Sequence, residues 1–327
     1  AARSGIKRVH WLSDFDSLFR QLMCQCDHVF LNSNEHPRAV IETESRETRF
    51  THRCLRDFPL HDYQRLAPLM HGLRVIKQPQ ELEALAEAIR ITGAGFRRVA
   101  KFVKPGVHEF EIEAELSHEF IRQRARGFAY TPIIATGANA CVLHYITNHC
   151  QCQDGELLLL DVAANYGNYN ADLTRTIPVN GRFTARQRKV YDSVLRVFRE
   201  CDRMLRPGVL IREYQEEVAK LMTSELIGLG LLDRNDVEKQ DPEKPLYKKY
   251  FPHGTSHPLG IDVHDVGHMW KPVEAGMVFT IEPGIYIRDE ALGVRLENNV
   301  LIGPDRNTDL MAGIPIEAGE IESLMQG

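Results

Sequence analysis

Apolar residues recur with the period of a helix in four segments of the chain. Between Leu82 and Ile89 they follow the i, i+3, i+4, i+7 spacing, and Pro79 stands in the first turn, which predicts a helix from about 78 to 103. Similar patterns predict helices at 109–126, 184–205 and 211–228. The first and third of these helices are followed by a Pro-Gly pair, which is common where helices end.

Strand-like runs lie between and after these helices. Short runs occur at 131–136 and 141–145, and Glu156-Leu-Leu-Leu-Leu-Asp161 predicts a buried strand that ends in a carboxylate. Residues 170–179 are interpreted as its return strand. Further along, the runs 277–287 and 294–302 are joined by a short polar segment, which predicts an antiparallel hairpin.

The second hairpin is expected to bring two glutamates together. With the turn centred between 289 and 290, Glu282 lies opposite Glu297 on one face, with Cβ atoms about 4.5–5.5 Å apart. A bulge at Pro283-Gly284 is the alternative, and it shifts the register by one residue. The paired arrangement supplies two carboxylates that can bridge metal ions.

The first hairpin is expected to repeat this arrangement with two aspartates. A two-residue loop at 166–167 makes Asp161 and Asp172 direct cross-strand partners on one face. Two solvated aspartates at hairpin ends are the alternative. Asp161 follows four leucines, however, and a buried carboxylate without a partner is costly. Metal ligation is therefore favoured.

An internal repeat relates the two halves of this region. Phe-Val-Lys-Pro-Gly-Val at 102–107 resembles Met-Leu-Arg-Pro-Gly-Val at 204–209, and each copy lies between two helices and precedes a hairpin with carboxylates. Chance similarity of helix ends is the alternative. The matching order of elements favours two related α/β halves that bring both carboxylate pairs to one central site.

The remaining segments carry no comparable chemistry. Residues 1–76 mix short extended runs with polar turns and are interpreted as a partial α/β domain that precedes a second domain at 77–327. The charged, Pro-broken segment 233–250 is expected to be a surface loop, and the tail after 303 is Gly- and Asp-rich.

Composition narrows the class of protein. A chain of 327 residues with 43% apolar and 26% charged residues is typical of a globular protein of two domains. A net charge of −5 favours neither nucleic acid nor anionic membrane as a partner, and no apolar run is long enough for a membrane span. Seven cysteines without a Cys-x-x-Cys spacing favour a reducing, cytoplasmic location, and no signal peptide is recognisable at the start.

The segment 253–297 concentrates side chains that bind metals. His253, His257, His264 and His268 lie in one stretch ahead of Glu282 and Glu297, and the stretch contains no cysteine. Imidazole and carboxylate together suit Mn, Fe, Co or Zn, and a carboxylate-rich set favours Mn. His268 is interpreted as a structural or surface residue. Asp262 and Asp265 flank His264 and either orient it or stabilise a turn.

These motifs together resemble a known family. Asp161 and Asp172, His257 within His-Gly-Thr-Ser-His-x-Leu-Gly-Ile-Asp-Val-His-Asp, Glu282 in Thr-Ile-Glu-Pro-Gly-Ile-Tyr and Glu297 in Val-Arg-Leu-Glu-Asn resemble the pita-bread metallopeptidases over residues 78–327. Within that family the chain is most similar to the Xaa-Pro aminopeptidase and prolidase branch. The resemblance implies a pseudo-symmetric α/β (α+β) catalytic domain, preceded by a smaller α/β domain.

The resemblance also implies roles for individual residues. Five residues are expected to hold two divalent ions, most often Mn²⁺, with Co²⁺, Fe²⁺ or Zn²⁺ as alternatives: Asp161, Asp172, His257, Glu282 and Glu297. His144, His253 and His264 are expected to line the substrate pocket, and Arg295 to support the metal carboxylates. Pro258 departs from the family, in which an aromatic residue usually follows the metal-binding histidine. A homodimer or higher homo-oligomer is expected from the resemblance alone.

The implied reaction is hydrolysis of the bond before a proline at the second position of a peptide. A hydroxide bridging the two metals attacks the carbonyl of the first residue. Glu282 transfers the proton to the leaving nitrogen, and His253 donates a hydrogen bond to the oxyanion, while His264 and His144 position the peptide around the proline.

Other activities remain as alternatives. A prolidase that cleaves Xaa-Pro dipeptides needs the same ligands, and sequence does not separate it from the aminopeptidase. A non-enzymatic pita-bread binding module and a metal-free creatinase-like enzyme are disfavoured because every ligand is present. Methionine aminopeptidase is disfavoured by the preceding domain and by Arg295.

Overall fold

The computed structural model describes residues 5–33, 35, 42–267 and 270–327, so His268 lies outside the described residues. The chain divides into two compact units, Ala1–Leu73 and Arg74–Gly327. The predicted division at 76/77 stays a prediction.

The first unit is a small α/β arrangement. Its two strands run parallel, with His28 opposite Asp62 and Leu31 opposite Arg65. The rings of Phe15, Phe19, Phe50 and Phe58 stack or meet at tilted and edge-on angles between the helices. The elements are α1 (Phe15–Met23), β1 (His28–Leu31), α2 (Arg46–Asp57) and β2 (Asp62–Arg65), and α3 (Ala67–Val75) extends past the unit boundary.

Four long helices of the second unit match the predicted segments. They are α4 (Pro79–Phe102), α5 (Glu109–Arg122), α6 (Ala185–Met204) and α7 (Ile211–Gly228). The Thr184 side chain accepts a hydrogen bond from the Gln187 N–H and so caps α6, as Thr does at helix starts. Helix α5 ends at Arg122 rather than at the predicted 126, because Arg124 has a φ of 67°, which lies outside the helical region.

The strands of the second unit form small sheets around two hairpins. The first half contains β3 (Gly127–Phe128), β4 (Ile133–Thr136), β5 (Leu157–Asp161), β6 (Ala164–Tyr166), β7 (Tyr169–Asn170) and β8 (Thr174–Pro178). The second contains β9 (Val278–Ile281), β10 (Gly284–Ile287), β11 (Leu292–Arg295), β12 (Asn298–Leu301) and β13 (Thr308–Asp309). All strand pairs within these sheets are antiparallel.

The register of the second hairpin is the predicted one. Gly284 pairs with Arg295 in β10–β11, and Ile281 pairs with Asn298 in β9–β12. Both pairings keep one register across the intervening residues, which places 282 opposite 297. No bulge shifts this register between the two strand pairs, so the paired arrangement of the two glutamates is confirmed.

The register of the first hairpin differs from the prediction. Asp161 pairs with Thr174, and Tyr166 pairs with Tyr169, so the two-residue turn is Gly167-Asn168 and not 166–167. Both turn residues have positive φ, 59° and 69°, as a type I′ turn requires, and a tyrosine at 166 does not favour that conformation. Moving the turn by one residue shifts the register by two. Asp172 is therefore a diagonal neighbour of Asp161, still on the same face.

The internal repeat corresponds to two matching halves. In the first, the Gly106 N–H donates to the Cys152 carbonyl and the Cys152 N–H donates to Val107. In the second, Gly208 and Val273 form the same pair of hydrogen bonds, with Val209 as the second acceptor. Asp161 lies nine residues after Cys152, and Glu282 lies nine residues after Val273.

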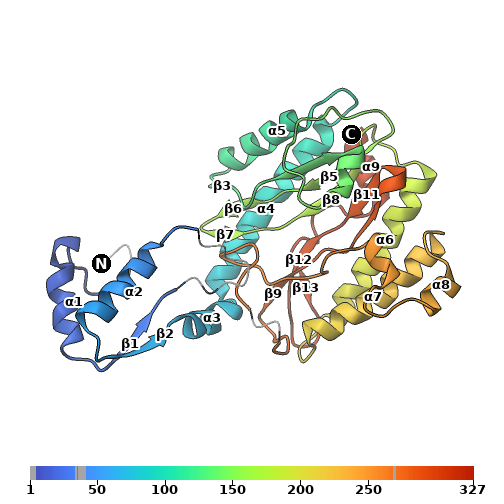
Figure 1. Ribbon diagram of the computed structural model, residues 1–327. Helices are drawn as coiled ribbons and strands as arrows, with labels where there is room; N and C mark the ends of the chain where they lie inside the picture. Colours follow the sequence, from blue (N-terminus) through green and yellow to red (C-terminus); the bar gives the residue numbers. More distant parts are fainter. Residues whose placement is uncertain (1–4, 34, 36–41, 268–269) are drawn as a thin grey trace. The chain divides into compact units, whose positions relative to one another are not determined.

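Each half has its own hydrophobic core under its pair of helices. Residues of α4 and α5, among them Phe96 and Phe120, pack on one side of the β5 and β8 strands. Residues of α6 and α7, such as Tyr191 and Met222, pack against β9 and the β10–β12 strands. Figure 1 shows the two helix pairs outside and the strands between them.

One predicted strand was wrong, and two later segments contain short helices that the sequence analysis did not predict. Residues 141–145 are not a strand, because the chain forms a short 3-10 helix at Gly137–Cys141 and then a loop. The segment 233–250 contains α8 (Arg234–Glu238), capped by the Asp233 carboxylate, and a 3-10 helix at Leu246–Lys249. The tail contains α9 (Ala318–Gln326), whose Ala318 and Ile321 are buried against the rest of the unit.

The structure also bears on two further features, membrane-spanning helices and disulfide bonds. Among the described residues, no helix combines the length and the apolar character that crossing a membrane requires. All seven cysteines carry free thiols, and Cys24 and Cys26 are exposed.

Candidate metal centre

The strand β9 positions the segment that carries His257. Residues 255–259 run antiparallel beside β9, with the Glu282 N–H donating to the Thr255 carbonyl and the Thr280 N–H donating to the His257 carbonyl. The His257 N–H in turn donates to the Thr280 hydroxyl at 3.2 Å. Side chains of alternate residues share a face of a strand, so this pairing places the His257 ring beside the Glu282 carboxylate.

The two hairpins meet at Thr174 and Glu297. The Glu297 N–H donates to the Thr174 carbonyl, which forms an antiparallel bridge between the halves. The Thr174 hydroxyl also donates to a Glu297 carboxylate oxygen at 2.7 Å. Asn299 of β12 binds the backbone of Asp172 from both sides, accepting from its N–H and donating to its carbonyl. Buried backbone contacts therefore fix Asp172 and Glu297 relative to each other.

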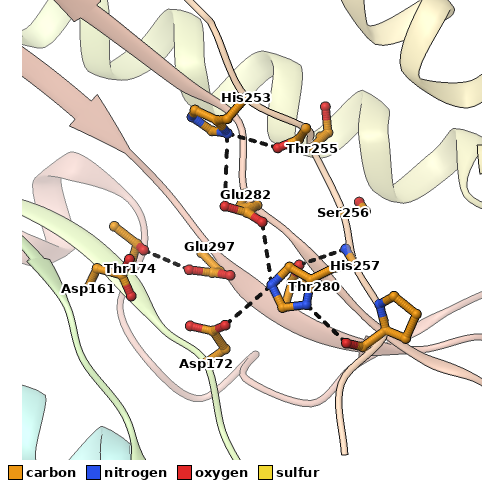
Figure 2. Close-up of polar contacts among 12 residues, drawn as sticks. Asp161, Asp172, Thr174, His253, Thr255, Ser256, His257, Thr280, Glu282 and Glu297 are labelled. Atoms are coloured by element: carbon orange, nitrogen blue, oxygen red, sulfur yellow. Dashed lines mark hydrogen bonds and ion pairs between the residues drawn. The ribbon is translucent and has the colours of Figure 1, made fainter. Parts of the chain in front are cut away.

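The five predicted ligand side chains converge at this junction, as Figure 2 shows. His257 Nε2 lies 3.5 Å from Asp172 Oδ2 and 3.5 Å from Glu282 Oε1. Asp172, His257 and Glu297 each offer a ligand atom within 4.8 Å of the others. Asp161 joins the cluster because the Tyr130 hydroxyl lies 2.6 Å from both Asp161 Oδ1 and Asp172 Oδ1.

Sequence reasoning missed three polar residues of this cluster. Tyr130 lies between the two aspartates, Thr174 binds Glu297, and the Tyr286 hydroxyl accepts a hydrogen bond from Arg295 at 2.8 Å. Thr174 and Tyr286 carry a recognisable signal, because they lie two residues after Asp172 and four residues after Glu282 on strands of period two. Tyr130 comes from a separate segment and carries no such signal.

Arg295 contacts one of the four carboxylates directly and a second side chain of the cluster, Thr174. Its Nη2 lies 2.5 Å from Asp161 Oδ2, and its Nε donates to the Thr174 hydroxyl at 3.2 Å. The side chain is buried. Arg295 thus compensates part of the negative charge and holds Asp161 and Thr174 at a fixed separation.

Burial and mutual repulsion raise the pKa of several site carboxyls. Burial, followed by the charges of His257 and Asp172, which act in opposite directions, leaves the pKa of Glu282 at about 7. Burial and the neighbouring carboxylates raise the pKa of Glu297 well above its usual value. The pKa of Asp161 is raised by burial, which outweighs the opposing effect of Arg295.

The hydrogen bonds of His253 define its tautomer. Nδ1 lies 2.8 Å from the Gly254 carbonyl, which only accepts, so Nδ1 carries a proton. Burial, followed by the charge of Arg295, lowers the pKa of His253 to about 3, so the ring is neutral and Nε2 accepts from the Tyr286 hydroxyl at 2.8 Å. His253 Nδ1 is 4.0 Å from Glu282 Oε2. As a donor to an oxyanion, His253 would act from Nδ1 and give up the Gly254 carbonyl.

His144 and His264, which the resemblance implies as substrate-pocket residues, lie on loops. The His264 ring lies against the His257 ring at a tilt, with centroids 3.8 Å apart and planes inclined by 31°. His144 is exposed on the loop after the 3-10 helix, and it contributes to the lowered pKa of His253 after burial and Arg295.

The donor set fits divalent metal ions. Four carboxylates lie close together in a largely buried site with the positive charge of Arg295, and such an arrangement is costly without further cations. Oxygen donors with one imidazole suit first-row divalent ions. Asp161, Asp172, His257, Glu282 and Glu297 are the residues that would hold them.

Known proteins resemble the chain in both sequence and structure. The sequence profile of metallopeptidase family M24 matches residues 83–304. The chain is 40% identical over 272 residues to Xaa-Pro aminopeptidase of Escherichia coli, covering 79% of this chain and 61% of that protein. It is 31% identical over 334 residues to human Xaa-Pro aminopeptidase 3, covering 99% of this chain and 65% of the relative. The chain thus spans less than two thirds of the length of these relatives.

A solved structure extends the resemblance to the fold. Zinc-substituted aminopeptidase P of E. coli in complex with product superposes with a TM-score of 0.84 at 34% identity, over 98% of this chain and 76% of that structure. The predicted pita-bread fold is therefore confirmed. Because the family profile covers more than half of the residues, the chain belongs to metallopeptidase family M24.

Proposed function

We propose that this chain is an Xaa-Pro aminopeptidase, which releases the first residue from peptides with proline at the second position. The observation that carries the proposal is the convergence of two carboxylate pairs and His257 at one junction of the two halves. The names of the relatives and of the aminopeptidase P structure support the choice of substrate.

We further propose that the site holds two divalent ions and that Mn²⁺ is the physiological metal. The predominance of carboxylate oxygens over imidazole supports Mn²⁺ over Zn²⁺. The bound ions would supply Lewis-acid chemistry and lower the pKa of water at the site. A zinc-substituted relative exists, so the metal is to be tested directly.

Glu282 is our proposed proton carrier. Its carboxylate lies between His257 and His253 at the end of the cluster. The bond before proline is a tertiary amide, so its nitrogen has no hydrogen and must gain a proton to leave. A carboxylate at this position takes a proton from the attacking water and passes it to that nitrogen.

The three histidines outside the ligand set are proposed to hold the peptide. His253 donates from Nδ1, the nitrogen that carries its proton, towards the oxygen that becomes negative during attack. His264, beside the metal-binding His257, and His144, on the exposed loop, position the residues around the proline. Because the three histidines have different neighbours, the role of each can be tested by a separate substitution.

The test is a metal analysis combined with a peptide panel. We expect the purified chain to contain divalent metal, to lose activity on chelation and to regain most with Mn²⁺. The panel compares an Xaa-Pro-Yaa tripeptide, an Xaa-Pro dipeptide and an Xaa-Ala-Yaa control. Preferential cleavage of the tripeptide supports the aminopeptidase, and cleavage of the dipeptide alone supports a prolidase. Cleavage of the alanine peptide at equal rate contradicts both.

We also propose a reducing compartment such as the cytoplasm and a homo-oligomeric state. The seven free thiols, two of them exposed, support the compartment. The oligomeric state rests on family resemblance, and light scattering of the purified chain measures it.

A further inference from the structure

A second cluster of charges, built around a buried Lys–Asp pair, lies beside the candidate metal centre. Lys77 Nζ donates to Asp265 Oδ2 at 2.8 Å, and both side chains are nearly inaccessible, at 2% and 1% exposure. The Arg74 guanidinium contacts the other oxygen of Asp265 and also binds Asp262 at 2.8 Å. None of these four residues belongs to the proposed ligand set or substrate pocket.

Backbone contacts join these charges to the loop that carries His264. The Asp265 N–H donates to the Pro258 carbonyl, which also forms a hydrogen bond with His257 Nδ1. The Lys77 N–H donates to Gly276, and its Nζ also donates to the Arg74 carbonyl, so Lys77 is fixed at both ends. Asp265 is therefore a tether between the segment 74–77 and the loop 258–265.

The packing at Gly260 shows how closely this loop approaches the tether. A Cβ at Gly260 would collide with Asp265 Oδ2 and would meet Lys77 Nζ at 3.0 Å. The Gly260 carbonyl accepts from Asn170 N–H, and Asn170 Nδ2 donates to the next carbonyl, that of Ile261. The loop is thus held from two sides, and His264 lies directly before the tethered Asp265.

We propose that Lys77 and Arg74, acting through Asp265, are positioning residues that hold the His264 ring against His257. This inference rests on the proposed function for its effect on catalysis. The order of contacts is continuous: Lys77 and Arg74 to Asp265, Asp265 to its neighbour His264, and His264 to the ring of the metal ligand. An ion pair of this kind fixes an arrangement without touching the substrate.

Asp265→Asn is the main test because it keeps the shape of the side chain and removes its charge. With Mn²⁺ and an Xaa-Pro-Yaa tripeptide, we expect kcat/KM to fall about 10- to 100-fold, as misplacement of a reacting geometry does. Metal stoichiometry should stay at the wild-type value. In the His264→Ala background the same change should alter kcat/KM less than about twofold, because the effect runs through His264. An equal loss in both backgrounds overturns the proposal.

A second variant is needed in case Asp265→Asn unfolds the chain by leaving Lys77 without a charged partner. Lys77→Met/Asp265→Leu removes both charges, and replacing a whole buried pair is tolerated far better than breaking it. We expect this variant to remain folded and to show the same non-additivity with His264→Ala. Asn307→Ala serves as a control for simple destabilisation, since its side chain binds the Asp202 and Leu205 carbonyls instead.

Hydrogen exchange tests the tether without any enzyme activity. In the chelator-treated protein, Asp265→Asn should speed amide exchange across 258–266, and Asn307→Ala should not. Unchanged exchange in this loop overturns the proposal. If wild-type protein cleaves no peptide, the proposed function fails while the exchange result still decides the tether.

Discussion

At the scale of single residues, the geometry of the candidate metal centre depends on hydrogen bonds between its residues and their neighbours. Asp172 and Glu297 are buried, and their backbones are fixed by Asn299 and Thr174. Neither can withdraw into solvent when its neighbours change. Their geometry is therefore a property of the folded halves rather than of a mobile loop.

Replacing Asp172 or Glu297 by alanine should abolish peptidase activity. Each change removes one proposed ligand from a group whose donor atoms lie within 4.8 Å of each other. Metal analysis after dialysis should show less bound metal in both variants, and circular dichroism should show the wild-type fold. Full activity in either variant would contradict a two-metal site.

Thr174→Val tests a residue that sequence reasoning missed. The hydroxyl donates to the Glu297 carboxylate and accepts from Arg295 Nε, so valine removes one hydrogen bond from each side chain at nearly constant volume. Loss of such a supporting partner typically lowers metal affinity about 10- to 100-fold, which competition with a fluorescent chelator measures. Thr223→Val is the matched control, because that hydroxyl binds a carbonyl within α7. Equal affinities in the two variants would exclude a supporting role for Thr174.

At the scale of elements, periodic segments were predictable and contacts between distant segments were not. The four long helices and the Glu282–Glu297 register follow from local patterns. Helix α9 was missed because its short apolar face is specified by burial of Ala318 and Ile321 against other elements. Tyr130 was missed because its role arises from a contact with two other segments.

The turn of the first hairpin was predicted one residue too early, because the alternation of apolar and polar residues does not determine the register. Alternation defines which face a side chain occupies, and a shift of two residues leaves the face unchanged. The prediction that Asp161 and Asp172, both proposed ligands, share a face was therefore correct, although their predicted direct pairing was wrong. The deciding information was the positive φ of Gly167 and Asn168.

Gly167→Ala should lower the stability of the protein by about 1–2 kcal/mol, the cost of a left-handed conformation for a residue with a Cβ. The side chain itself has space, since its nearest neighbour would be the Ala84 Cβ at 3.8 Å. Urea unfolding measures the change. Asn168→Gly is the control and should not destabilise, because glycine accepts the same conformation. Equal destabilisation by both variants would contradict a type I′ turn as the cause.

At the scale of the whole molecule, folding brings the negatively charged carboxylates of the two halves close together. Each half supplies one carboxylate pair, and the bridge between Thr174 and Glu297 joins them. The folded state therefore concentrates charges that the unfolded chain separates. Protons and metal ions are alternative ways to relieve this repulsion, which makes stability depend on pH and metal together.

The direction of this dependence follows from the pKa values. Burial raises the pKa of Glu282 from 4.5 to about 7, and the pKa values of Glu297 and Asp161 are raised as well. Between the unfolded and folded values the folded chain holds more protons. Stability of the metal-free protein must then fall as pH rises through about 7. His253 opposes this below 6.5, because burial lowers its pKa to about 3, so the fall is clearest above 6.5.

Thermal unfolding of chelator-treated protein between about pH 6.5 and about pH 8 should therefore show a Tm that decreases with pH. Saturating Mn²⁺ should raise Tm more at about pH 8 than at about pH 6.5, because at the higher pH the metal displaces fewer protons from the carboxylates. Calorimetric titration in buffers of different ionisation enthalpy should detect proton release on binding. Glu282→Gln removes the group with the pKa of about 7 and should flatten the decrease. A metal-free Tm that rises across this range would mean that the carboxylates are already ionised and compensated by neighbouring groups without metal.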